Sequence, residues 1–126
     1  MAEELHKKLQ QEVENFQALQ KQYQKTLSVR QQLGGQLFEN ETVKTELDLV
    51  KKDQEVYKLI GPVLIKQDIE EALQNVNKRM DYIKGELKRV DDTITDMEKK
   101  QDSQRDVLNK LQQQYQKAQL VAATKN

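Results

Sequence analysis

Side chains that could perform covalent or acid–base chemistry are scarce in this chain of 126 residues. The sequence holds one histidine, His6, two serines, Ser28 and Ser103, and no cysteine. Nucleophilic catalysis needs a nucleophile and a base within hydrogen-bond reach, and His6 stands beside the N-terminus, where helices fray. We therefore expect His6 to be a solvated helix residue. Without cysteine, the chain forms neither disulfides nor thiolate metal sites.

Paired carboxylates and paired glycines are the remaining candidates for chemistry. Asp91-Asp92 and Glu70-Glu71 lie in long polar stretches with no cleft to exclude water, so we expect them to be ionised surface groups. Gly34-Gly35 lack the flanking strand and the lysine of a phosphate-binding loop. The sequence thus predicts no catalytic residue, no cofactor and no metal, in a protein that is not an enzyme.

The composition argues against nucleic acid or membranes as partners and favours an elongated or assembled protein. There are 21 basic and 21 acidic residues, and no segment forms the basic cluster that phosphate binding requires. With 36% hydrophobic and 5% aromatic residues, the chain has too few apolar side chains to form a thick hydrophobic core. No stretch approaches the length of a membrane span, and the N-terminal MAEELHKK has no apolar signal-like run. We expect a soluble, cytoplasmic protein.

The chain is organised around a short apolar segment, Val56 to Gln67, which reads VYKLIGPVLIKQ between two long polar stretches. Large apolar residues of these types favour extended backbone, and proline is excluded from helix interiors. Gly61 can adopt the positive φ of a two-residue hairpin turn, and Pro62, which lacks an N–H, suits the turn. We therefore predict a β-hairpin. The alternative is an irregular loop between two helices, but seven large apolar residues in ten positions are unusual for a solvated loop.

The stretch before the hairpin has the apolar periodicity of a coiled-coil helix, with steps of mostly three and four residues. The pattern is imperfect, because Arg30 and Asn40 fall at expected apolar positions. Gly34-Gly35 interrupt the middle at about 1 kcal/mol each relative to alanine, so a bend or a loosened turn is expected there. Lys51-Lys52 suit the negative end of the helix dipole, and the helix should end near them. The stripe consists of Leu5, Leu9, Val13, Phe16, Leu19, Tyr23, Leu27, Leu33, Leu37, Val43, Leu47 and Val50.

The stretch after the hairpin has a clearer start and a stricter pattern. Asp68 can cap the helix, with Glu71 three residues later as its capping-box partner. The stripe then alternates steps of four and three residues, which implies a 3.5-residue period and left-handed supercoiling. Gln101 and Gln104 occupy two successive stripe positions and should weaken the packing around them. The stripe consists of Ile69, Leu73, Val76, Met80, Ile83, Leu87, Val90, Ile94, Met97, Gln101, Gln104, Leu108, Leu111, Tyr115, Ala118 and Ala122.

A tight hairpin reverses the chain, so the two helices should pack antiparallel, with the numbers of facing residues adding to about 121 or 122. Leu47 should then face Leu73 to Val76, and Phe16 should face Gln104 to Leu108. At 1.5 Å per residue, each helix should span roughly 70 to 80 Å. The predicted fold is mainly α, a long antiparallel two-helix coiled coil joined by a single β-hairpin. We predict a single domain over residues 1–126, which consists of a helix (1–52), the hairpin (53–67) and a second helix (68–126).

The hairpin needs cover that this chain does not supply. Two isolated strands are marginal in water, and both outer edges and the apolar side chains lack cover within the sequence. Hairpins of other subunits could add strands at both edges and build a sheet or a closed barrel. The predicted subunit interface consists of Val56, Tyr57, Leu59, Ile60, Val63, Leu64 and Ile65.

Two segments, VYKLIGPVLIKQD (56–68) and NKRMDYIKGELKRVD (77–91), closely resemble the β-class subunits of the prefoldin family. The resemblance covers nearly the whole chain, and the single hairpin, rather than two, indicates the β class. It implies a heterohexamer of two α-class and four β-class subunits, whose hairpins form a platform from which coiled coils project. It also implies that the complex holds non-native actin and tubulin for the cytosolic chaperonin, without ATP.

Two functions fit these residues: a holding chaperone that binds unfolded proteins, or a structural coiled-coil scaffold or tether. Apolar side chains outside the helix seam near the termini favour the chaperone, because a tether does not need them and a helix buries only one stripe against a single partner. Leu120 and Val121 lie beside the stripe rather than on it. The predicted client-binding residues are Leu5, Leu9, Val13, Phe16, Leu111, Tyr115, Leu120 and Val121.

Overall fold

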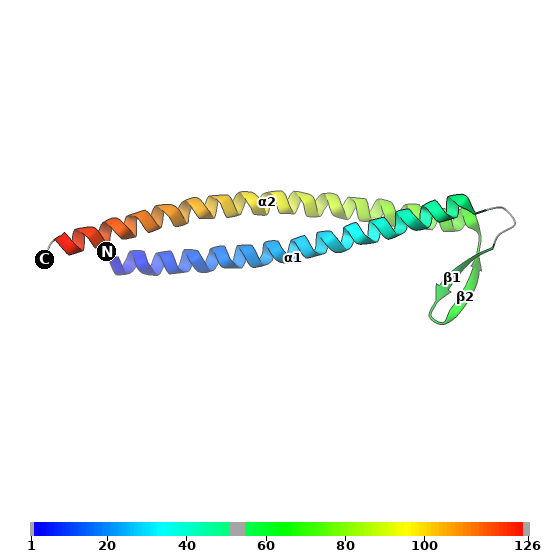
Figure 1. Ribbon diagram of the computed structural model, residues 1–126, viewed down its shortest axis with the longest axis horizontal. Helices are drawn as coiled ribbons and strands as arrows, with labels where there is room; N and C mark the ends of the chain where they lie inside the picture. Colours follow the sequence, from blue (N-terminus) through cyan, green and yellow to red (C-terminus); the bar gives the residue numbers. More distant parts are fainter. Residues whose placement is uncertain (1, 51–54, 125–126) are drawn as a thin grey trace. The chain divides into compact units, whose positions relative to one another are not determined.

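The computed structural model describes residues 2–50 and 55–124, which form two long helices with a two-stranded antiparallel hairpin between them (Figure 1). Helix α1 spans Ala2–Leu49 and helix α2 spans Ile69–Thr124. Strands β1 (Val56–Ile60) and β2 (Val63–Gln67) form the hairpin. The predicted fold class, mainly α with a single hairpin, is confirmed.

The chain consists of two compact units, each built from parts of both helices. The hairpin unit is Val29–Val90 and contains both strands. The terminal unit contains the described residues up to Ser28 together with those from Asp91 onward. Each unit therefore has its own section of the helix seam and its own candidate functional surface.

In the hairpin unit, α1 and α2 pack through a small apolar cluster. Leu47 meets the first turns of α2, as the predicted register requires, and Ala72 joins the stripe residues. Val56 at the start of β1 also packs against the cluster, so the strand is anchored to the helices at that residue. The buried members are Leu47, Ala72, Val76 and Met80, and the partly buried ones packed against them are Leu37, Val56 and Leu73.

In the terminal unit, three contacts between α1 and α2 define the register. In each pair the residue numbers add to 121, so the predicted antiparallel alignment is confirmed in this unit. The pairs are His6 with Tyr115 (ring centroids 5.5 Å apart), Phe16 with Arg105 (5.7 Å from ring centroid to guanidinium carbon) and Tyr23 with Glu98 (a 3.2 Å hydrogen bond from the hydroxyl to Oε1).

The apolar stripe of α2 faces α1 along nearly its whole predicted length. Every stripe position is buried or half-buried except Ala122. The stripe of α1 is less well covered, because Val13 and Val43 remain exposed. This difference between the helices follows the sequence, in which the α2 pattern is strict and the α1 pattern has exceptions.

Gly34-Gly35 do not interrupt α1, since the helix is continuous from Ala2 to Leu49, and a bend at these glycines stays a prediction. Most helix stability in proteins comes from tertiary packing of an apolar face, which can offset the propensity cost of two glycines. Asn40, at an apolar stripe position, is half-buried, and its Nδ2 donates a 2.7 Å hydrogen bond to the Gln36 carbonyl oxygen. Its amide donor is thereby satisfied within the helix.

The helix ends agree with the sequence signals where the structure describes them. The Asp68 carbonyl accepts the first helical hydrogen bond of α2 from the Ala72 N–H at 2.9 Å, which places Asp68 at the predicted N-cap. At the end of α1, the Val50 N–H donates to the Leu47 carbonyl at 3.2 Å. Lys51-Lys52, expected near this end, lie outside the described residues. The capping-box role of Glu71 stays a prediction.

Gly34→Ala should stabilise the chain by about 0.5–1 kcal/mol, because alanine is the better helix former and, apart from the adjacent residues and the backbone of its own helix, no described atom lies within 4 Å of the place its Cβ would occupy. Gly61→Ala is the contrasting variant. It should destabilise the hairpin by about 1–2 kcal/mol, because Gly61 has a φ of +57°, where a Cβ clashes. Thermal unfolding followed by circular dichroism measures the first change, and NMR of the strand amides measures the second. A loss of stability in the Gly34 variant would contradict our account of α1.

Candidate functional site

The hairpin has a fixed register and a two-residue turn. Ile60 pairs with Val63, so Gly61 and Pro62 form the turn. Gly61 stands at the first central position with φ of +57°, which is the position and sign of φ that a type II′ turn requires. This turn matches the twist of the strands, and it confirms the predicted hairpin and the role of Gly61.

Alternation along the strands divides the side chains of the hairpin between two faces. Leu59 and Leu64 form a cross-strand pair on one face, beside the pair of Tyr57 and Lys66. The other face carries Val56, Lys58, Ile60, Val63, Ile65 and Gln67. Both faces are therefore rich in apolar side chains.

Six of the seven predicted interface residues are exposed, and the exposure includes both faces. Leu59 on one face is 67% exposed and Ile65 on the other is 47% exposed. Val56 is the exception, because it is half-buried against the apolar cluster of the hairpin unit. Two short strands with apolar groups on both faces and unpaired outer edges form a surface suited to strand addition. The exposed members are Tyr57, Leu59, Ile60, Val63, Leu64 and Ile65.

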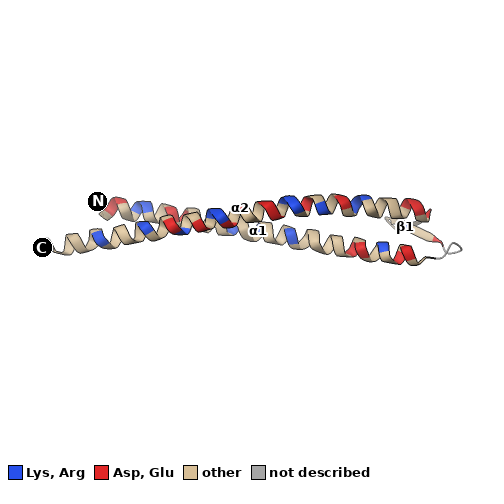
Figure 2. Cartoon of the chain, turned by 90° about the horizontal axis from the view of Figure 1, so that it is seen from above, with Lys and Arg blue, Asp and Glu red and all other residues tan. Residues whose placement is uncertain are grey.

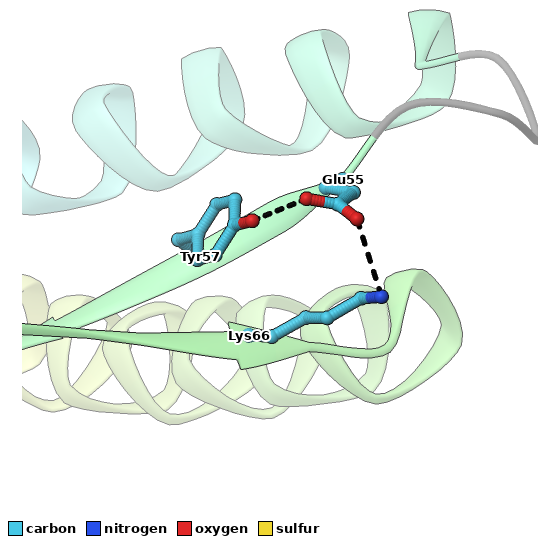
Figure 3. Close-up of polar contacts among 3 residues, drawn as sticks. All are labelled: Glu55, Tyr57 and Lys66. Atoms are coloured by element: carbon cyan, nitrogen blue, oxygen red, sulfur yellow. Dashed lines mark hydrogen bonds and ion pairs between the residues drawn. The ribbon is translucent and has the colours of Figure 1, made fainter.

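A small polar network closes the open end of the hairpin (Figure 3). The Tyr57 hydroxyl donates a hydrogen bond to Glu55 Oε2, and Lys66 Nζ lies 3.3 Å from Glu55 Oε1. The hydrogen bond from Tyr57, together with Lys66, lowers the pKa of Glu55 below its ordinary value of 4.5. Glu55 in turn raises the pKa of Tyr57 above 10.0. The network links both strands on the face that carries Leu59 and Leu64.

The hairpin network should respond to acid. Because the folded-state pKa of Glu55 is lowered, its contribution to stability is present above pH 4.5 and is lost as the pH falls through the lowered value. An NMR titration of the Glu55 carboxyl carbon should give a midpoint below 4.5. In Tyr57→Phe, which lacks the hydroxyl donor, the midpoint should move back up. An unchanged midpoint in that variant would mean that Tyr57 is not the main cause.

An apolar groove lies between the two helices in the terminal unit, with a volume of about 780 Å³. Leu5 of α1 and Val121 of α2, both predicted to bind clients, lie in its lining. Ala118 and Ala122 of α2 contribute small side chains to the same lining. The groove is lined by Ala2, Glu4, Leu5, Lys8, Gln114, Lys117, Ala118, Val121 and Ala122.

The predicted client-binding residues differ in their exposure. Leu120 and Val121 are 66% and 54% exposed, and Val13 is also exposed. Leu5, Leu9, Phe16 and Tyr115 are half-buried in the seam. Leu111 is buried, at 6% exposed, and so offers no surface in this conformation.

Charge is distributed unevenly along the helices. Acidic and basic side chains interleave along α2 as far as Asp106 (Figure 2), whereas α2 after Asp106 has Lys110 and Lys117 as its charged residues up to Thr124. Few charges surround Leu120 and Val121, which suits contact with apolar chain segments. Across residues 2–50 and 55–124, no group of three His, Asp or Glu residues could hold a metal ion. No helix in the described ranges is long and apolar enough to cross a membrane.

Known proteins share both the sequence pattern and the fold of this chain. The family model described as "Prefoldin subunit" matches residues 10–115. The chain belongs to the prefoldin subunit family. It is 49% identical over 123 residues to prefoldin subunit 6 of Mus musculus, covering 98% of this chain and 97% of the relative. It is 47% identical over 113 residues to prefoldin subunit 6 of Arabidopsis thaliana, covering 90% and 88%. The chain thus resembles the sixth eukaryotic prefoldin subunit over nearly its whole length.

Solved prefoldin structures share the fold. The prefoldin beta2 subunit from Thermococcus strain KS-1 aligns with a TM-score of 0.65 at 17% identity, covering 73% of this chain and 98% of that one. The beta subunit from the same strain aligns with a TM-score of 0.60 at 20% identity, covering 88% and 91%. As a prefoldin subunit, the chain is a chaperone component that assembles with other prefoldin subunits.

Two features of the surfaces were not predicted from the sequence. The Glu55 network depends on which residues the hairpin register brings together, and Glu55 lies before the apolar segment. Exposed aromatic residues also occur beside the seam of the hairpin unit, at Phe38 and Tyr82, which are 70% and 68% exposed. Both residues lie off the apolar stripes of their helices, and this position in the sequence could have identified them as exposed.

Proposed function

We propose that this prefoldin subunit holds non-native proteins without nucleotide, in a cytoplasmic heterohexamer of two α-class and four β-class subunits. The hairpin joins it to the other subunits. Apolar residues of the terminal unit bind clients such as actin and tubulin, which the complex delivers to the cytosolic chaperonin. The clients, the stoichiometry and the chaperonin are those that the family resemblance implies.

The observation that carries this proposal is the apolar surface that the helix seam leaves uncovered in the terminal unit. Leu120 and Val121 are exposed beside the seam, and the groove next to them is lined by Leu5 and Ala118. A helix that packs against a single partner buries only one stripe, so such residues stay in water unless another chain covers them. Unfolded proteins expose apolar segments that fit such a surface.

Weak contacts of this kind become useful when several subunits act together. Each terminal unit binds a client modestly, and the affinities multiply when several engage one chain at once. Such binding reverses without a nucleotide. The alternative function is a structural scaffold or tether, which the same helices would serve, but exposed Leu120 and Val121 have no role in it.

The test is removal of the terminal segments. Deleting residues 1–12 and 113–126 leaves the hairpin unit intact, so the variant should still enter the complex. Suppression of aggregation of chemically denatured actin should fall, most clearly when the other subunits are trimmed in the same way. Sedimentation measures assembly and light scattering measures aggregation.

A matched variant separates lost apolar surface from lost length. Leu120→Ser with Val121→Ser keeps α2 at full length and should reduce holding in the same direction, whereas Gln112→Ser with Gln113→Ser, at exposed polar positions, should not. Full holding activity in a complex whose subunits all lack these terminal segments would support the scaffold instead.

A further inference from the structure

A small groove lies over the seam of the hairpin unit, beside the exposed ring of Tyr82. It has a volume of about 430 Å³ and is lined by residues of both helices. Ile83 is buried in the seam and Tyr82 is 68% exposed, so the two residues together give the groove an apolar surface. The lining, which we call the Tyr82 groove, consists of Gln36, Asn40, Lys78, Arg79, Tyr82 and Ile83.

The charge of the Tyr82 groove is positive. Lys78 and Arg79 are exposed, and neither forms an ion pair with another residue in the described part of the chain. Among the described residues of the lining, none is acidic. Glu86, one turn after Tyr82, forms an ion pair with Arg89 at 2.9 Å, which offsets its charge. The groove therefore favours a ligand that carries negative charge.

The residue types in the groove indicate a protein ligand rather than a nucleic acid. Tyrosine and arginine are enriched at the centres of protein contact sites, where an aromatic ring supplies apolar area and a guanidinium pairs with carboxylates. Phosphate backbones are bound by larger clusters of Lys and Arg than Lys78 and Arg79 provide. A peptide can pair acidic side chains with these two residues while an apolar side chain covers Tyr82 and Ile83.

The groove differs from the hairpin in the kind of contact it suits. Permanent subunit interfaces are the more hydrophobic class, and the exposed apolar residues of both hairpin faces fit that description. Most residues that line the groove are polar or charged, as in contacts that form and dissociate. This difference favours a transient partner over a neighbouring subunit.

We infer that the Tyr82 groove binds an acidic segment of a protein outside the complex, in which carboxylates flank an apolar residue. Lys78 and Arg79 pair with the carboxylates, and Tyr82 and Ile83 contact the apolar side chain. The groove belongs to the hairpin unit, whereas Leu120 and Val121 belong to the terminal unit. Recruitment of an acidic partner is therefore a function separate from client holding.

Binding is measured by fluorescence anisotropy with the assembled, co-expressed complex and a labelled synthetic peptide. The peptide alternates Asp and Glu with Leu, and a control peptide carries Asn and Gln in place of the acids. The acidic peptide should bind, and its binding should weaken as salt is added, whereas the neutral peptide should not bind. No binding of the acidic peptide at about 1 mM, where even a weak site is half occupied, would overturn the inference.

Two charge-reversed variants locate the site. Lys78→Glu with Arg79→Glu should weaken binding about tenfold or more, because attraction becomes repulsion. Lys84→Glu with Lys88→Glu is the matched control, with the same change of charge at exposed positions of the same helix, and it should bind as the wild type does. Lys84 and Lys88 directly follow stripe residues, whereas Arg79 and Tyr82 directly precede them, so the control residues lie on the other side of the seam. Equal losses in both variants would assign the binding to overall charge and overturn the inference.

Two further measurements identify the contacts. Tyr82→Ala removes the ring without a change of charge and should weaken binding of the acidic peptide severalfold. A peptide with Lys in place of the acids should bind the variant with Lys78→Glu and Arg79→Glu but not the wild type. Failure of this charge exchange would contradict direct pairing at these two positions.

The remaining outcomes concern the kind of partner. Displacement of the acidic peptide by a single-stranded oligonucleotide would indicate a general site for polyanions and overturn the inference. Loss of the variant with Lys78→Glu and Arg79→Glu from the complex would make the groove a subunit contact, which also overturns it. Suppression of actin aggregation by this variant should stay at the wild-type level, so the result is independent of the proposed function.

Discussion

Replacing Leu59 and Ile65 together by aspartate should remove this subunit from the prefoldin complex. Both side chains are exposed on the hairpin, at 67% and 47%, and they lie on opposite faces. Partner hairpins that cover these faces would bury the introduced carboxylates without a counter-charge, at a cost of several kcal/mol each. That cost is a large share of a typical subunit interface energy.

The result is read from the mass of the complex. Sedimentation and native mass spectrometry of the co-expressed complex should show the double variant outside it. Phe38→Asp, which puts the same charge at an exposed apolar residue of α1, is the matched control and should assemble normally. Normal stoichiometry of the double variant would show that the hairpin does not form the interface between this subunit and the others.

Single variants show which face of the hairpin contacts the partner subunits. Leu59→Asp tests the face that carries Leu64 and the Glu55 network, and Ile65→Asp tests the face that carries Ile60 and Val63. We expect both to weaken incorporation, because apolar side chains are exposed on both faces. A defect in one variant alone would assign the subunit contact to that face.

The hairpin could be predicted from sequence because its signals are local. Gly61 and Pro62 restrict the turn, the flanking residues favour extended backbone, and both effects act within a few residues. The helix register followed in turn, because a two-residue turn and a 3.5-residue stripe leave little freedom in how two helices align. The contact of His6 with Tyr115 agrees with it, and so does the cluster that contains Leu47 together with Leu73 and Val76.

Features that depend on the choice of side-chain partner could not be predicted in this way. Glu55 forms its bonds because the register places Lys66 and Tyr57 beside it, and the sequence alone does not state which carboxylate bonds to which donor. Gly34-Gly35 have low helix propensity, but packing along the rest of α1 decides the outcome. Leu111 and Leu108 are both leucines of the α2 stripe, yet Leu111 is buried and Leu108 is half-buried, so the burial of Leu111 also depends on local packing.

Ile83→Ala should destabilise the helix pair by about 2–5 kcal/mol. Ile83 is 6% exposed and lies on the α2 stripe within the hairpin unit. Removing its outer carbons loses their burial and leaves a cavity that the two helices only partly fill. In a fold with so few buried side chains, one such loss is a large part of the total stability.

Tyr82→Ala is the control that isolates burial from helix propensity. Tyr82 is the preceding residue on α2 and is 68% exposed, so its replacement removes more atoms but little buried area. Its effect should stay within about 0.5 kcal/mol, as for most exposed positions. Urea unfolding of both variants, followed by circular dichroism, gives the two free energies. Similar values would place Ile83 on the surface and shift the helix register, whereas a large loss in Ile83→Ala alone supports a seam in which the α2 stripe carries the packing.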